Sequence, residues 1–186
     1  MEQFLIEKGI LKAYFGVGPV VVVPDGVKQI GGCYPEFEPK EPAFPRELCG
    51  DPIGYKAFYC NNSVEEIYLP DSVETIGFKS MEHCKNLRIL SFSSKMKTVE
   101  CNGLLGCNNL KTIIYRGTVF EFTCLSLAGH LDLDVVYCTD GTINLHQEFY
   151  IEELHFPGTR AEWDRKYSAG DWRNKRCRKI VCIDDD

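Results

Sequence analysis

The sequence predicts a mostly β solenoid, in which coils of 23 residues stack along one axis and pair their strands into a parallel sheet. Three observations predict this fold. Apolar residues recur at a 23-residue step, each block begins with the alternation typical of a strand, and a Pro-Asp turn signal can follow the strand. One coil of this length cannot bury its own apolar side, so stacked coils are expected to share one core.

The repeat is clearest from residue 64 onward. The strand positions that recur are Val64, Leu87, Leu110 and Leu133, then Ile67, Leu90, Ile113 and Val136, then Leu69, Phe92, Tyr115 and Cys138. A second short apolar run, predicted to return along another side, recurs as Val73, Met96 and Val119 and as Ile76, Val99 and Phe122. Residues 21–31 match residues 67–77 at twice the period, so about 25 residues interrupt one coil.

We expect a single domain spanning residues 1–186. Its predicted parts are an N-terminal hairpin cap (1–16), a first coil (17–31), a Pro/Glu-rich insertion (32–56), regular coils (57–145), and a C-terminal coil and cap (146–186). Proline removes backbone donors, so a regular strand is not expected in the insertion. The insertion either packs over one side of the solenoid or binds a partner.

The C-terminal part contains two candidate helix starts. Thr118 with Glu121 and Thr159 with Glu162 have the spacing of a capping box, which predicts a short helix after each threonine. The last coil of a solenoid has no neighbour to cover it. We therefore expect three aromatic residues to seal this end, namely Trp163, Tyr167 and Trp172.

Ten cysteines allow either a disulfide framework or reduced core thiols. Cys84 and Cys107 occupy equivalent positions in successive coils, which favours buried thiols that fill an inner corner and bond weakly to the backbone. The first residues show neither a cationic start nor a long apolar region, so no signal peptide is visible. A cytoplasmic location is favoured, and a secreted or cell-surface location stays open if a leader has been removed.

These residues resemble the BspA-like leucine-rich repeat proteins of bacteria and some protists. The shared pattern lies in Ile67–Gly77, Ala57-Phe58, Cys84–Leu87 and Cys107–Leu110, and the resemblance covers nearly the whole chain except residues 32–56. It implies a right-handed leucine-rich-repeat-like solenoid and a protein-binding or adhesive role without catalytic residues. Ser80-Met81 and Gly103-Leu104 stand where Ala-Phe is usual, which questions the regularity of the convex side.

The residues that alternate with the core positions are predicted to point outward from the sheet. They hold more aliphatic and aromatic residues than a surface needs, and a contiguous apolar patch usually marks an interface. A partner protein, a second copy of the chain or the insertion could cover it. The predicted face comprises Val22, Tyr68, Ile89, Ser91, Thr112, Ile114, Val135, Tyr137 and His155, with Val20, Glu66 and Glu153 beside them.

The sequence contains no pattern that indicates nucleic-acid binding, membrane insertion or cofactor chemistry. The net charge is −6, and the densest basic stretch, residues 173–179, is followed by three aspartates, so we expect no nucleic-acid partner. No run of about 20 apolar residues predicts membrane insertion. Neither a His-Glu-x-x-His motif nor a phosphate-binding loop occurs, and no cofactor is expected.

Two weaker candidate sites remain. Cys138, Cys177, Cys182 and His146 lack the close ligand pairs of a structural zinc site, and a catalytic Cys107–His130 pair would need an accessible thiol. The sequence therefore predicts a non-catalytic protein-interaction module. The alternative is a structural, self-assembling or adhesive unit, and a hydrolase is a remote third.

Overall fold

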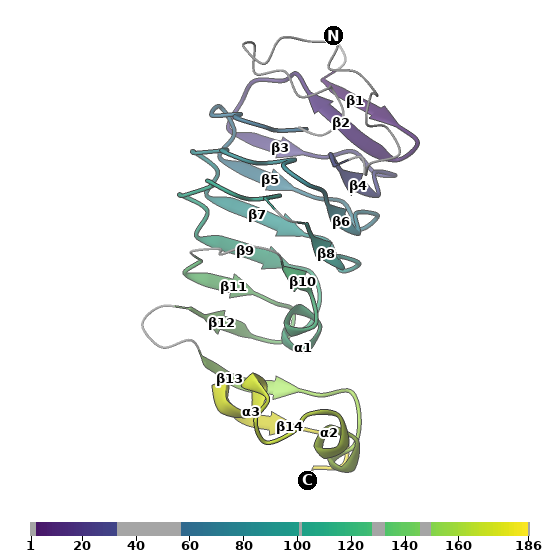
Figure 1. Cartoon of the computed structure of the whole chain (residues 1–186), viewed down its shortest axis with the longest axis vertical. Coiled ribbons are helices and arrows are strands. Elements are labelled where there is room, and N and C mark those ends of the chain that lie inside the picture. The colour runs from purple at the N-terminus through teal and green to yellow at the C-terminus, as the bar shows by residue number, and fades with distance from the viewer. Residues whose placement is uncertain (1–2, 33–56, 101, 128–132, 146–149, 186) are drawn as a thin grey trace, which may run out of the picture.

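The computed structural model describes residues 3–32, 57–100, 102–127, 133–145 and 150–185. They form an elongated stack, in which the elements follow one another from the N-terminal to the C-terminal end (Figure 1). Two sheets, one of eight strands and one of six, run along the stack. The predicted solenoid is confirmed.

The larger sheet contains the first strand of each coil. Its parallel strands pair at exact repeat positions, with Val21 opposite Ile67, Ile67 opposite Leu90, and Leu90 opposite Ile113. The predicted 23-residue period, and the doubled step across the insertion, are thus the register of the sheet. These strands are β3 (Val20–Val22), β5 (Glu66–Tyr68), β7 (Ile89–Phe92), β9 (Thr112–Tyr115) and β11 (Val135–Tyr137).

The second short run of the first three coils forms the parallel strands β4 (Gln29–Ile30), β6 (Thr75–Ile76) and β8 (Thr98–Val99) of the smaller sheet. The next predicted run, with Val119 and Phe122, is helical instead, and the strand that pairs with β8 is the later β10 (Ser126–Leu127). The predicted N-terminal hairpin is present as β1 (Phe4–Glu7) and β2 (Ile10–Tyr14), and β2 pairs with β4. The hairpin therefore extends only the smaller sheet past the first coil.

The core lies between the two sheets as a ladder of stacked side chains. Ile67, Leu90, Ile113 and Val136 are fully buried, and so are Ile30, Ile76 and Val99 from the opposite sheet. Each buried aliphatic side chain contributes about 1.5–3 kcal/mol relative to an exposed one. Because every coil contributes equivalent side chains, each coil covers the apolar surface of its neighbour.

The third side of the coils consists of turns. Cys84 and Cys107 each link the turns of one coil to those of the preceding coil. Both thiols are buried and donate hydrogen bonds to the carbonyls of Phe58 and Met81 in the preceding coil, at 2.9 and 3.0 Å. This confirms the inner-corner role predicted for these two cysteines. Cys60 and Cys124 are exposed, so the expectation of buried thiols is wrong for them.

The 23-residue pattern changes after β9. Helix α1 (Val119–Thr123) takes the place of a second-run strand, and β12 (Thr142–Asn144) turns back antiparallel to β11. Strand β13 (Tyr150–His155) is antiparallel to β12 and parallel to the last strand, β14 (Cys177–Val181). Between β13 and β14 lie α2 (Arg160–Lys166) and α3 (Trp172–Arg176).

Both predicted capping boxes are present. Thr118 accepts a hydrogen bond from the Glu121 amide at the start of α1, and Thr159 accepts one from the Glu162 amide at the start of α2. An aspartate then binds the first amide of each helix: Asp140 accepts from Val119 and Asp184 from Arg160, both at 2.7 Å. The segment from β13 to β14 is therefore a second, longer version of β9–α1–β11.

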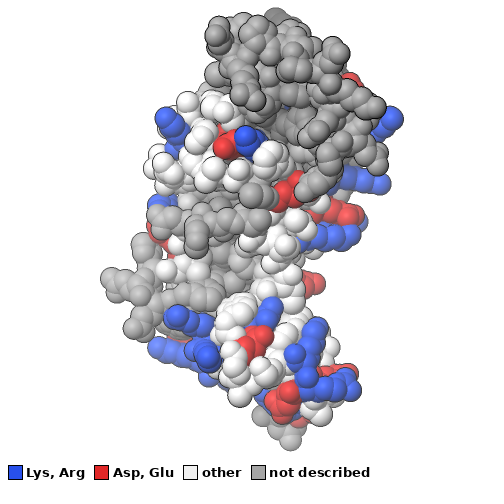
Figure 2. Space-filling model, viewed as in Figure 1, with Lys and Arg blue, Asp and Glu red and all other residues white. Residues whose placement is uncertain are grey.

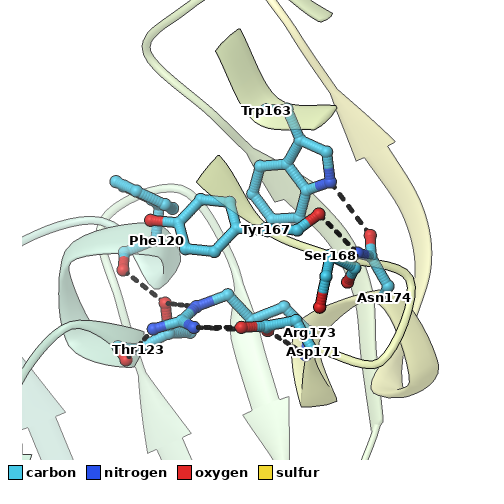
Figure 3. A network of polar contacts seen from close by, with 8 residues as sticks. All are labelled: Phe120, Thr123, Trp163, Tyr167, Ser168, Asp171, Arg173 and Asn174. Atoms are coloured by element: carbon cyan, nitrogen blue, oxygen red, sulfur yellow. Dashed lines mark hydrogen bonds and ion pairs between the residues drawn. The ribbon is translucent and has the colours of Figure 1, made fainter. Parts of the chain in front are cut away.

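The C-terminal cap is fastened to the solenoid by Arg173 (Figure 3). Its guanidinium donates to the carbonyl and hydroxyl of Thr123 at 2.8 and 3.1 Å, and pairs with Asp171 at 3.3 Å.

Trp163 and Tyr167 are buried as predicted, and Trp163 donates to Asn174 at 2.9 Å. Trp172 is 39% exposed, so the prediction that it seals the end is wrong. It packs along Arg173 at the edge of the cap instead.

Candidate protein-binding face

The outward face of the larger sheet is built from two columns of residues, one on each side of the buried ladder. Strand pairing aligns Val20, Glu66, Ile89, Thr112 and Val135 in the first column. The second column contains Val22, Tyr68, Ser91, Ile114 and Tyr137. These are the columns that the sequence predicted, apart from their C-terminal ends.

The columns differ in exposure along the stack. The side chains are most open at the two ends, where Val22 is 67% and Tyr137 49% exposed. Tyr68 and Ile114 are half-buried, and the small Ser91 between them is only 4% exposed. Ser91 is therefore a poor contact residue, and we remove it from the group expected to touch a partner.

The predicted continuation of the second column to His155 is wrong. The antiparallel strand β12 lies between β11 and β13, so Thr142 is the residue opposite Tyr137. His155 pairs instead with Val181 of β14, and its ring lies 2.9 Å from Glu153. The alternation in Thr142-Ile143-Asn144 was the available signal for this extra strand.

Charged side chains flank the strands of this face. On one side, Arg88 binds Glu65 of the preceding coil at 2.7 Å and lies 4.0 Å from Glu66. On the other side, Arg116 lies 3.4 Å from Asp71 and donates to the carbonyl of Leu69. The apolar and aromatic strip of Val22, Tyr68, Ile114 and Tyr137 thus has a charged border. An apolar centre with a polar border is the usual anatomy of a protein interface.

Tyr68 is held in place within the strip. Its hydroxyl donates to the Glu66 carboxylate at 2.8 Å, and this hydrogen bond raises the pKa of the Tyr68 phenol. The tyrosine therefore stays neutral at physiological pH. Because its polar end is fixed along the strand, the ring is preorganised as a rigid contact surface.

Two of the described cysteines, Cys138 and Cys177, are poorly suited to nucleophilic chemistry. Burial raises the pKa of Cys138 to about 12 and that of Cys177 to about 11. At neutral pH both groups are thiols, whereas the thiolate is the nucleophile and the metal ligand. His130, the proposed partner of Cys107, lies outside the described residues.

The zinc site considered from the sequence does not assemble among the residues that are described. Cys138 and Cys177 do not join Cys182 in a cluster of potential ligands, and His146 lies outside the described part of the chain. Among the described residues, Cys182 instead lies near Asp184 and Asp185. Those aspartates already bind the amide of Arg160 and its guanidinium, so they serve to close the cap.

The basic stretch near the C-terminus is mostly paired with acidic groups. Arg178 binds Glu152 at 2.9 Å and Lys179 lies 3.4 Å from Glu153, while Arg173 is part of the cap and not a solvated side chain. Figure 2 shows both basic and acidic side chains at the C-terminal end of the molecule. No helix in the described ranges is long and apolar enough to span a membrane.

Stacked coils of one length, a parallel sheet with an apolar outward strip, and cysteine-bonded corners define a repeat protein of the leucine-rich class. The sequence model of the BspA-type leucine-rich repeat region matches residues 51–152 in 6 copies. Because this match spans more than half of the chain, the protein belongs to the BspA-type leucine-rich repeat family.

Comparison with individual proteins gives less information about the fold than the family match does. No curated protein sequence matches the chain. Among solved structures, a T. pallidum leucine-rich repeat protein is similar, with 16% sequence identity, a TM-score of 0.45, and coverage of 94% of this chain and 75% of that protein. The assignment to the family rests on the repeat match.

Proposed function

We propose that the protein is a non-catalytic binding module, and that the outward face of the larger sheet binds a protein partner. The single observation that carries this proposal is the apolar and aromatic strip of Val22, Tyr68, Ile114 and Tyr137, aligned by strand pairing and bordered by charges. The family is made of interaction or structural repeats, which agrees with a binding role.

The two tyrosines are the expected anchors of this interface. Tyr68 and Tyr137 belong to one column, three coils apart, and Tyr137 is half exposed. Tyrosine provides a large contact area at a small entropy cost, and it is enriched among residues that dominate binding energy. Ile89, Thr112 and Val135 would complete the contact in the neighbouring column.

The proposal is tested with the double variant Tyr68→Ala/Tyr137→Ala. Wild-type and variant chains are immobilised, partner proteins are captured from cells of the source organism, and the affinity for the identified partner is measured. Each tyrosine is expected to account for at least a 10-fold change in Kd. The matched control is Leu105→Ala, which removes a 49% exposed apolar side chain from another side of the coil.

Two results would contradict the proposal. One is an unchanged affinity of the double variant with an unchanged fold, which would place the binding site elsewhere. The other is an equal loss in the Leu105→Ala variant, which would show that the tyrosines have no special role. Circular dichroism spectra and melting temperatures of all three chains control for folding.

A further inference from the structure

Strand β3 is the outermost strand of the larger sheet at the N-terminal end (Figure 1). The hairpin β1–β2 covers the end of the smaller sheet, because β2 pairs with β4 and leaves β3 aside. The described residues therefore provide β3 with a neighbour on one edge only, namely β5.

The backbone of β3 shows which groups face the open edge. The carbonyl of Pro19 accepts from the amides of Glu65 and Glu66, and the amide of Val23 donates to the carbonyl of Tyr68. Since successive residues of a strand direct their backbone groups to opposite edges, Val20 and Val22 present their N–H and C=O groups away from β5. No other described segment pairs with these groups.

The side chains of this edge are apolar and uncharged. Val20 is 52% and Val22 67% exposed. Phe15 and Val17, in the segment that joins β2 to β3, are 67% and 87% exposed. Proteins normally protect an open edge with charges, bulges or a covering element, and an unprotected apolar edge is a template for pairing with another strand.

The opposite end of the same sheet is protected in this way. Strand β14 carries Arg178 and Lys179, both exposed and paired with glutamates of β13. The two ends of the sheet are therefore chemically different. Pairing of β3 with β14 of another copy would place exposed valines against a charged strand.

We propose that a second copy of the chain occupies the β3 edge, through antiparallel pairing of the two β3 strands about a two-fold axis at Val21. In this register Val20 lies opposite the partner's Val22, and Val22 opposite the partner's Val20. All open-edge N–H and C=O groups of these residues then find partners. The two eight-stranded sheets become one continuous sheet.

The register also suits the side chains. Each cross-strand pair on the outward face joins two valines, and β-branched pairs are favourable neighbours across strands. Because the contact uses the same surface on both copies, it closes at a dimer and does not continue into a fibre. Val22 belongs both to this edge and to the proposed partner-binding strip, whereas the anchors Tyr68 and Tyr137 are not part of the open edge. Failure of the dimer would therefore leave the proposed partner-binding role standing.

Sedimentation equilibrium over a range of protein concentrations tests the proposal. The wild-type chain is expected to dimerise, and Val20→Lys/Val22→Lys is expected to raise the dimer dissociation constant about 100-fold or more, because like charges would face each other. Both side chains are more than half exposed, so the variant should keep its fold. Tyr137→Lys, on an inner strand, is the control and should dimerise normally.

Amide hydrogen exchange tests the register. The amides of Val20 and Val22 should become protected as the dimer fraction rises, and should exchange rapidly in the lysine variant. A wild-type monomer at all concentrations would overturn the proposal, and so would a dimer that the two lysines leave intact. Protection of these amides in a monomer would also overturn it, because the edge would then be covered from within the chain.

Discussion

The thiol of Cys107 donates a hydrogen bond of 3.0 Å to the carbonyl of Met81, which lies 26 residues earlier in the chain. Cys84 makes the same bond to Phe58 one coil before, again 26 residues earlier. The neighbouring Cys107 thiol and burial both raise the pKa of Cys84. Each thiol is therefore a structural donor that joins the turn of one coil to the next.

Alkylation should separate the structural thiols from the exposed ones. With iodoacetamide at pH 8, Cys60 and Cys124 are expected to react in the native protein, because both are exposed. Cys84, Cys107 and Cys182 are buried and should react only after unfolding in urea. Peptide mass spectrometry at successive times measures this order, and rapid native labelling of Cys84 would refute the assignment.

Loss of a helix-capping side chain should lower the free energy of unfolding by a small amount. Thr118→Ala removes the side chain that accepts from the Glu121 amide, and should lower the free energy of unfolding by about 1 kcal/mol. Thr159→Ala should cost a similar amount at α2, where the same geometry recurs. Urea denaturation measures both, with Thr118→Ser as the control that retains the hydroxyl. An equal loss in Thr118→Ser would argue against a capping role.

Removal of the Arg173 guanidinium should loosen the C-terminal cap. Arg173→Met keeps an apolar stem but loses the bonds to Thr123 and leaves Asp171 without this cation, so the expected cost is about 2–3 kcal/mol. Hydrogen exchange should accelerate first in α3 and β14. Lys175→Met, an exposed change on the same helix, should stay within about 0.5 kcal/mol. Equal effects of the two changes would contradict the account.

Tyr115 should contribute to a loss of stability at high pH. Burial raises the pKa of its phenol from 10.0 to about 12, so the folded state favours the neutral form. This contribution is complete below pH 10 and is lost as the pH rises from 10 to 12. Tyr115→Phe should therefore show a shallower decline of melting temperature over this window than the wild type. Parallel declines would show that the phenol is not coupled to folding.

The period of 23 residues made most of the fold predictable. The register of β5, β7, β9 and β11 follows directly from the equivalence of Ile67, Leu90, Ile113 and Val136. Capping boxes were equally clear, because Thr118 and Glu121 act over three residues and need no tertiary context. Local or strictly repeated signals thus determined the elements that were predicted correctly.

The failures occur where the repeat changes or where burial depends on packing. His155 was misplaced because β12 inserts an antiparallel strand, and a period cannot reveal a reversal of direction. Trp172 was assigned to the seal by residue type, although Arg173 occupies that contact with Thr123. Ser91 belongs to the predicted column but is nearly covered, because its side chain is smaller than those of Tyr68 and Ile114 on either side.

The shared core of stacked coils is tested most directly by methyl NOE spectroscopy on Ile, Leu and Val side chains. The account predicts strong cross-peaks between Ile67 and Leu90 and between Leu90 and Ile113, which lie on adjacent strands about 4.8 Å apart. The cross-peak between Ile67 and Ile113 should be much weaker, and a soluble paramagnetic agent should leave all three unaffected. Absent cross-peaks between adjacent coils, or methyl groups broadened by the agent, would contradict the central claim.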